Sequence, residues 1–161
     1  MSSEAIDYLI RRYNVDIRYD RPIKSVSCLY VHPGCMPILS VREGLEDRER
    51  IEAVAVQLAR LTLGHSGRRF LWVHERQDRK EWRQALRTAA RLFISDEDMD
   101  RAERRHYDPW ELADELDVTV RLVLIRAEEW FQQAGRVVSF EIRRSVDETV
   151  FAWMGSEGWF R

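Results

Sequence analysis

The sequence predicts an α+β fold, in which a helical core carries a small three-stranded antiparallel sheet near the N-terminus and a strand with a tail at the C-terminus. Two observations lead to this prediction. In several long segments apolar residues recur every three or four positions, as they do on the buried face of a helix. In shorter segments, gathered mainly in residues 15–41, apolar and polar residues alternate as they do in half-buried strands.

The N-terminal quarter of the chain combines one helix with the three strands. A helix is expected over residues 2–13, where the apolar positions recur at helical spacing. The strand-like segments VDIRYD (15–20), SVSCLYV (25–31) and MPILSV (36–41) follow, and His32-Pro33-Gly34 marks a turn between the last two. Together these segments predict one small antiparallel sheet.

Two long helices are expected at the centre of the protein. The first runs from about Asp47 to Gly64 and is apolar on most sides, which is typical of a helix buried in its domain. A loop follows, and the second helix runs from about Arg79 to Phe93 with Trp82 on its core face. These two helices provide the largest part of the predicted core.

Capping signals predict shorter helices in the second half of the chain. Ser95 begins one of them, and Asp108-Pro109-Trp110-Glu111 combines a capping Asp, a Pro at the first helical position and a Glu at the third. Thr119 caps another helix that runs to about Gln133. The spacing over residues 108–132 is that of a helix-turn-helix pair. The segment VVSFEIRR (137–144) alternates like a strand and precedes an aromatic tail.

Composition limits the classes of function. The formal net charge is −2, so the overall charge does not favour nucleic-acid binding. No apolar stretch approaches the ~20 residues that a membrane span requires, and the first residues lack the apolar run of a secretory signal. We therefore expect a cytoplasmic protein without a membrane partner.

Two segments resemble the signatures of a known family. Residues 55–65 read AVQLARLTLGH, and residues 82–95 read WRQALRTAARLFIS. They are similar to the approximate signatures AHELAHLTLGH and ExEANxFAAxLLMP of the ImmA/IrrE family of bacterial and phage metallopeptidases. With the order of elements, the resemblance covers roughly residues 4–132. It implies a zincin-like helical core, and a family domain over residues 1–132 with residues 133–161 packed on the same core as a strand and tail.

The sequence departs from the family at the residues that carry its chemistry. The resemblance places the two histidine ligands at Val56 and Arg60, the catalytic glutamate at Gln57, the third ligand at Trp82 and a further acidic residue at Gln84. Valine offers no lone pair, arginine carries a permanent positive charge, and glutamine cannot take a proton from water at neutral pH. We therefore expect no catalytic residue, no metal and no cofactor. The sequence favours a protein that is not an enzyme.

The resemblance also implies a function. Family members cleave helix-turn-helix repressors, and a member without ligands would keep the substrate groove. We expect a degenerate pseudopeptidase of phage or mobile-element type, inside a bacterial or phage-infected cell. It would bind a DNA-binding repressor or a toxin-like regulator and act by occupying that partner. Its binding groove would be lined by the five positions that depart from the family: Val56, Gln57, Arg60, Trp82 and Gln84.

Four further possibilities are open on the sequence alone. An active zinc peptidase with displaced ligands would use His65, His74 and Glu81. A DNA-binding regulator would use the helix pair over residues 108–132, although its second helix offers few polar donors. The C-terminal strand would also allow a homodimer through its edge. A basic stripe on the second long helix is either a solvated face or a contact face for an acidic partner, and it consists of Lys80, Arg83, Arg87 and Arg91.

Overall fold

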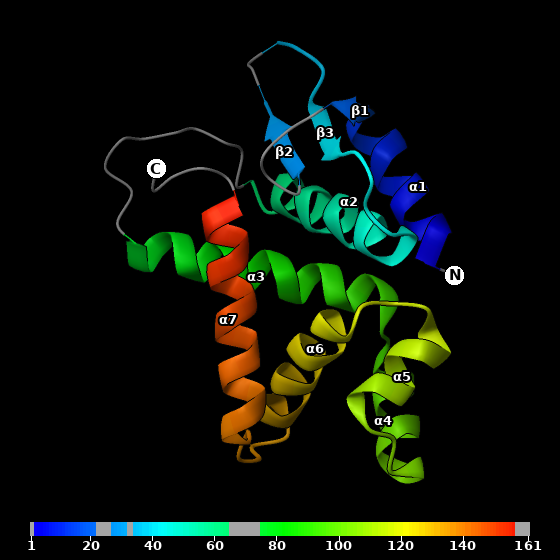
Figure 1. Ribbon diagram of the computed structural model, residues 1–161, viewed down its shortest axis with the longest axis vertical. Helices are drawn as coiled ribbons and strands as arrows, with labels where there is room; N and C mark the ends of the chain where they lie inside the picture. Colours follow the sequence, from blue (N-terminus) through cyan, green and yellow to red (C-terminus); the bar gives the residue numbers. More distant parts are fainter. Residues whose placement is uncertain (1, 22–26, 32–33, 65–74, 157–161) are drawn as a thin grey trace.

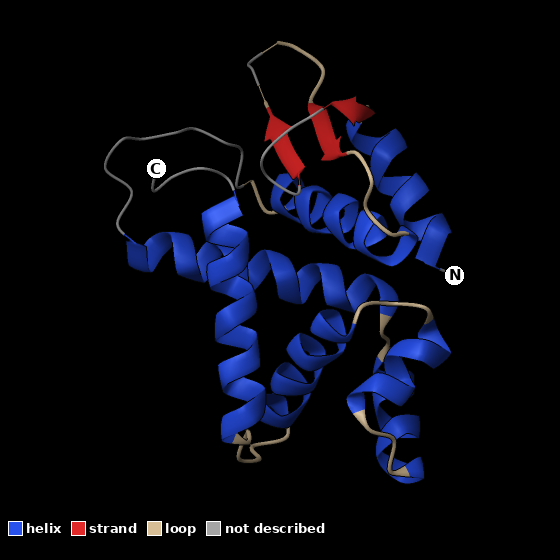
Figure 2. Ribbon diagram, in the orientation of Figure 1, coloured by secondary structure: helices blue, strands red, loops and turns tan. Residues whose placement is uncertain are grey.

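The computed structural model describes residues 2–21, 27–31, 34–64 and 75–156 (Figure 1). A small sheet and two helices make up one end of the molecule, and five further helices make up the rest (Figure 2). The α+β class is therefore confirmed. Within the described residues, no helix has both the length and the apolar character needed to cross a lipid bilayer.

The sheet has three strands, but it is mixed and not antiparallel. Helix α1 (Ser2–Tyr13) leads into β1 (Asp16–Arg21), which is followed by β2 (Ser27–Tyr30) and β3 (Ile38–Arg42). The order in space is β1-β3-β2, with β2 antiparallel and β1 parallel to β3.

The prediction of an antiparallel sheet was wrong because it assumed that neighbours in sequence are neighbours in space. The strands do alternate in direction along the chain, so placing β3 between the other two makes β1 and β3 parallel. Leu39 on β3 lies opposite Ile17 of β1 and Leu29 of β2. Leu39, Ser40 and Val41 are all buried, which fits a central strand covered on both faces.

Helices α2 (Asp47–Thr62) and α3 (Glu75–Phe93) pack against each other beneath the sheet (Figure 1). Nine consecutive residues of α2, from Glu52 to Arg60, are buried, which confirms that this helix lies in the interior. Helix α3 begins four residues earlier than the sequence indicated. Its buried face carries Trp82, Ala85, Leu86 and Ala89.

The three helices predicted from capping signals are present. They are α4 (Asp96–Arg105), α5 (Pro109–Leu116) and α6 (Val120–Gln133). Ser95 with Asp98 and Asp108 with Glu111 form complete capping boxes, and the Thr119 hydroxyl accepts a hydrogen bond from the Leu122 N–H.

The C-terminal strand is absent, because residues 140–156 form helix α7 (Phe140–Ser156). The alternation of Val138, Phe140 and Ile142 suggested a strand, yet Phe140 is exposed while Val138 is buried. The pattern that decides the structure is helical, and Ile142, Val146, Val150 and Trp153 face the core. A homodimer through a strand edge at this segment therefore has no structural basis.

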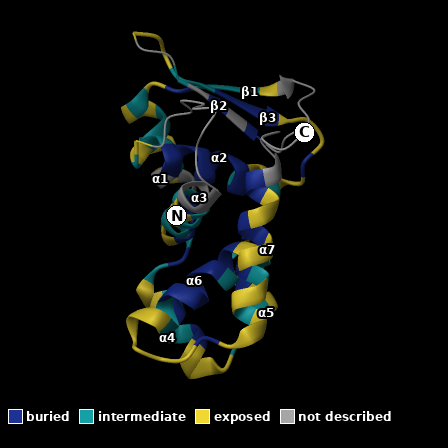
Figure 3. Cartoon of the chain, turned by 90° about the vertical axis from the view of Figure 1, so that its left-hand side faces the viewer, coloured by how far each residue is buried: buried dark blue, intermediate teal, exposed yellow. Residues whose placement is uncertain are grey.

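One hydrophobic core extends through the chain, from Val15 after α1 to Met154 on α7 (Figure 3). Helix α7 packs on α3 and α6. The segment 133–161 that the sequence separated from the family domain therefore contributes, through α7, to the same core as residues 1–132.

Candidate functional site

A buried polar cluster lies between α2 and α3, at the positions where the family resemblance places the catalytic centre. The Gln57 side chain donates from Nε2 to the Ser27 hydroxyl at 3.1 Å and to the Ser27 carbonyl oxygen at 3.3 Å. Arg60, one helical turn further along α2, donates to Gln57 Oε1 at 3.4 Å. The two side chains share one face of α2, because residues three apart on a helix are neighbours.

The Arg60 guanidinium also contacts α3. Its central carbon lies 4.2 Å from the centre of the Trp82 ring, which is a cation–π contact. The Trp82 ring in turn stacks on Trp153 of α7, with ring centres 5.6 Å apart and planes inclined by 29°. The consecutive helices α2 and α3 therefore meet α7, which is far from them in sequence, at this cluster.

The structure brings together three of the five predicted site residues. Gln57, Arg60 and Trp82 are in contact, and Arg60 and Trp82 are only 8% and 3% exposed. Val56 is fully buried next to them in the chain. Gln84 is exposed, since it is two residues and about 200° around α3 from Trp82. Gln84 therefore does not join the cluster that Gln57, Arg60 and Trp82 form.

Among the described residues, the cluster contains a guanidinium, an amide, a hydroxyl and an indole. A guanidinium donates hydrogen bonds but accepts none, and an amide is a poor base. These described groups can hold a carbonyl or carboxylate oxygen, and they are poor general acids and bases.

Metal-binding residues do not gather in the described part of the chain. No group of three His, Cys, Asp or Glu side chains is placed to hold an ion within residues 2–21, 27–31, 34–64 and 75–156. His65 and His74, two of the three alternative ligands, lie outside the described residues. Glu81 is half-buried on α3.

Three of the four cations in the basic stripe of α3 pair with carboxylates of α6. Arg83 and Arg87 both contact the Glu128 carboxylate of α6, at 2.6 Å and 3.1 Å. Arg91 pairs with Glu129 of α6, and both Arg91 and Lys80 are exposed. The sequence pattern alone does not reveal these pairs, because the matching carboxylates follow some 40 residues later in the chain.

Both arginines of helix α6 contact groups of the protein itself. Its polar donors are used internally, since Arg121 contacts the buried Glu52 of α2 at 3.2 Å. Arg126 is 2% exposed and donates to the Ile94 carbonyl oxygen at 3.1 Å and to Glu129 at 3.2 Å. The sequence analysis missed both internal roles, although a lone acidic residue such as Glu52 in an apolar helix was a usable signal.

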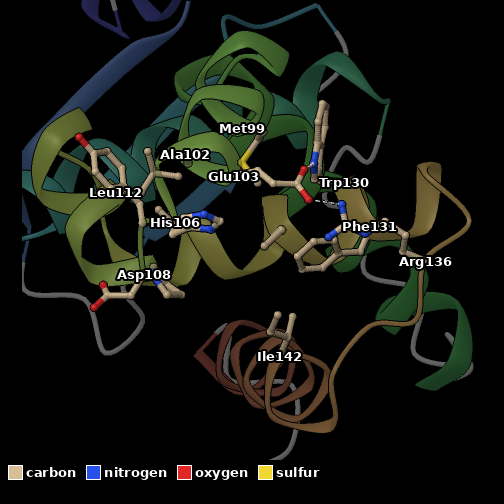
Figure 4. A pocket seen from close by; sticks show the side chains of 14 residues that line it. Met99, Ala102, Glu103, His106, Asp108, Leu112, Trp130, Phe131, Arg136 and Ile142 are labelled. Atoms are coloured by element: carbon tan, nitrogen blue, oxygen red, sulfur yellow. Dashed lines mark hydrogen bonds and ion pairs between the residues drawn. The ribbon is translucent and has the colours of Figure 1, made fainter.

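A second site, which the sequence did not indicate, is a cavity of about 320 Å³ between α4, α5, α6 and the beginning of α7 (Figure 4). Its deeper wall is apolar and includes Met99, Leu112 and Val123. Ala102 and Ala127 face the same space, and their small side chains leave it open. Tertiary packing creates this cavity, so no local sequence pattern marks it.

Comparisons with protein-family models, with curated proteins and with solved structures found no match.

Proposed function

We propose that the protein is a metallopeptidase-like binding protein without catalytic activity, which holds a protein partner and acts by occupancy. One observation carries this proposal. The side chains of Gln57, Arg60 and Trp82 converge, and these are the positions to which the ImmA/IrrE resemblance assigns the catalytic base, one histidine and the third ligand.

The chemistry of the cluster supports a binding role. Arg60 at the centre of the cluster repels a divalent cation. Its contact with Trp82 places a positive charge between α2 and α3, where a bound metal ion would otherwise link the two helices. The cluster then serves to hold the two helices together. A partner would then bind at a surface away from this cluster.

The proposed partner is a helix-turn-helix repressor or a toxin-like regulator, as the resemblance implies. Exposed apolar side chains at the end of the molecule away from the sheet support a protein partner. Trp110 is 64% exposed, Phe140 is 75% exposed and Val137 is 91% exposed. Large aromatic side chains of this kind are enriched at the centres of protein interfaces.

Restoring the family residues tests the architectural part of the proposal. The variant Val56→His, Gln57→Glu, Arg60→His, Trp82→Glu should bind about one Zn²⁺ per chain, whereas the unchanged protein should bind none at these positions. The matched control keeps Arg60 and carries only the other three changes, so it lacks one ligand and retains the repelling charge. A fourfold variant that is helical by circular dichroism and still binds no zinc would contradict the proposal.

Exposed residues provide the test of partner binding. Trp110→Ala with Phe140→Ala should weaken capture of a helix-turn-helix protein at least tenfold, measured by affinity purification and then by titration of the purified partner. Tyr8→Ala is the control, because Tyr8 is 55% exposed on α1 at the sheet end. Equal loss of the partner from both variants would argue against this surface.

The active-peptidase alternative is distinguished by metal analysis of protein purified without a histidine tag. About one zinc per chain, lost on His65→Ala, would favour it over the binding role. The DNA-binding alternative is disfavoured because Arg121 and Arg126 of α6 both pair with carboxylates of the protein itself. A gel shift that weakens steeply with salt would be needed to revive it.

A further inference from the structure

The cavity between α4, α5, α6 and α7 has the size and lining of a small-molecule site. Its volume is about 320 Å³, at the lower end of the roughly 300–1,000 Å³ that is typical of ligand pockets. An apolar cavity of about 150 Å³ suffices for benzene. The space is therefore sufficient for a molecule of about two fused rings.

The wall of the cavity is built from separate helices that hold it open. Met99 and Ala102 come from α4, Leu112 from α5, and Val123 and Ala127 from α6, and all five are buried. None of these side chains offers a hydrogen-bond donor or acceptor to a ligand. The deeper part of the cavity therefore favours an apolar body.

The charged groups at the cavity are already satisfied. The Glu103 carboxylate accepts a hydrogen bond from the Trp130 indole at 3.2 Å and pairs with Arg136. Both contacts lower the pKa of Glu103, and the hydrogen bond from the indole has the larger effect. The Glu103–Arg136 pair therefore stays ionised and carries no net charge. Asp108 Oδ1 accepts hydrogen bonds from two backbone N–H groups at the start of α5.

His106 is the exception among the polar side chains that line the cavity. None of the residues that the structure describes hydrogen-bonds to its imidazole, and in Figure 4 the ring projects from the end of α4 toward the middle of the cavity. Its backbone is left-handed, with φ at 56°, which fixes the position from which the ring projects. His106 is exposed, so its imidazole places one hydrogen-bonding group without a described protein partner at the solvent-facing side of the cavity.

We propose that this cavity binds a small, neutral, mostly apolar molecule of about two fused rings that carries one hydrogen-bonding group directed at His106. A charged ligand is disfavoured, because it would give up water without gaining an unpaired countercharge. The inference rests on the cavity alone and does not depend on the function proposed above.

The probe for the test is 2-naphthol, which is uncharged at pH 7 and has one hydroxyl group. Titration into the full chain with ¹³C-methyl-labelled methionine should shift the Met99 signal in a saturable way, with a Kd on the order of 0.1 mM for a ligand of this size. Nuclear Overhauser contacts from the naphthol ring to the methyl groups of Met99 and Ile142 should place it in the cavity without any mutation.

Two variants separate the apolar body from the hydrogen bond. Ala127→Leu fills the cavity and should weaken 2-naphthol at least tenfold. His106→Gly removes the imidazole at a backbone position that glycine accepts readily, and should weaken 2-naphthol about fivefold while leaving naphthalene unchanged. Trp110→Ala, which alters an exposed aromatic residue outside the lining, should change neither affinity.

Three results would overturn the proposal. The first is the absence of a saturable Met99 shift at 1 mM 2-naphthol. The second is the absence of ring contacts to Met99 and Ile142, which needs no variant and so holds even if Ala127→Leu fails to fold. The third is a loss of affinity in Trp110→Ala that matches or exceeds the loss in Ala127→Leu, because it would indicate binding to the exposed surface.

Discussion

Glu128 is the residue on which the packing of α3 against α6 most depends. Its carboxylate is 2% exposed and contacts Arg83 and Arg87, which are each about one quarter exposed. The ion pair stabilises the helix contact only while both charges are present, because an unpaired guanidinium at a buried interface keeps its desolvation cost. Local sequence analysis could assign the arginines to one helix face but could not identify what they contact.

Glu128→Gln should therefore destabilise the protein by about 2–4 kcal/mol, since among the described residues it leaves Arg87 without a carboxylate partner and Arg83 with Asp147 alone. Urea unfolding followed by circular dichroism would measure the change. Glu148→Gln is the matched control, because Glu148 pairs with Arg144 on the exposed side of α7 and should cost less than about 0.5 kcal/mol. Similar losses in the two variants would show that the buried network does not stabilise the fold.

At the candidate site, the sequence placed Gln57, Arg60 and Trp82 correctly near one another. The helical period fixes Gln57 beside Arg60, and the family resemblance placed α3 opposite α2. It could not indicate Trp153, which reaches Trp82 from the far end of the chain. The contacts missed by sequence analysis are those made between helices that are distant in sequence.

At the scale of single elements, the capping residues were the most reliable guides, because a cap acts within four residues. The N-terminus of α4 shows this. The Ser95 N–H and hydroxyl donate to Asp98 at 2.9 Å and 2.8 Å, and Asp98 also pairs with Arg101 at 2.6 Å. The strand predicted over residues 137–144 was wrong because its alternation extends over only a few residues. The helical pattern of α7 extends over a longer segment and decides the structure.

The α4 cap should make stability depend on pH. Burial raises the pKa of Asp98, but the hydrogen bonds from Ser95 and Arg101 outweigh it and hold the pKa below its ordinary 3.8. A carboxyl whose pKa is lowered in the folded state stabilises the fold above its ordinary pKa, and the contribution is lost as pH falls through the folded value.

Asp98→Asn should therefore cost about 1 kcal/mol at pH 7, and the difference from the unchanged protein should shrink below about pH 4. Urea unfolding at several pH values between 2 and 7 would show the convergence. Asp100→Asn, on the exposed side of the same helix, should give a difference that changes much less with pH. A constant deficit in Asp98→Asn across the whole range would exclude this account of the cap.

At the scale of the molecule, the sequence identified the helical centre and the α+β class. It did not indicate how the sheet and α7 pack around that centre. Sheet order and the position of α7 depend on contacts between segments that no local pattern links. Helix α7 closes the core, because its buried side chains Val146, Val150, Trp153 and Met154 join the cluster that begins at Val15. The protein should then unfold as one cooperative unit.

Trp153→Ala tests this cooperativity, because Trp153 is 5% exposed and stacks on Trp82 where α7 meets the α2–α3 pair. Removing a buried tryptophan should cost about 3–5 kcal/mol. The loss should appear equally in circular dichroism and in the Met99 methyl signal, which reports on the opposite end. Phe151→Ala is the control on the same helix, since Phe151 is 48% exposed and its contact with Arg79 should contribute about 1 kcal/mol or less. Two separate unfolding transitions in Trp153→Ala would show that the sheet end and the α4–α6 end are independently stable.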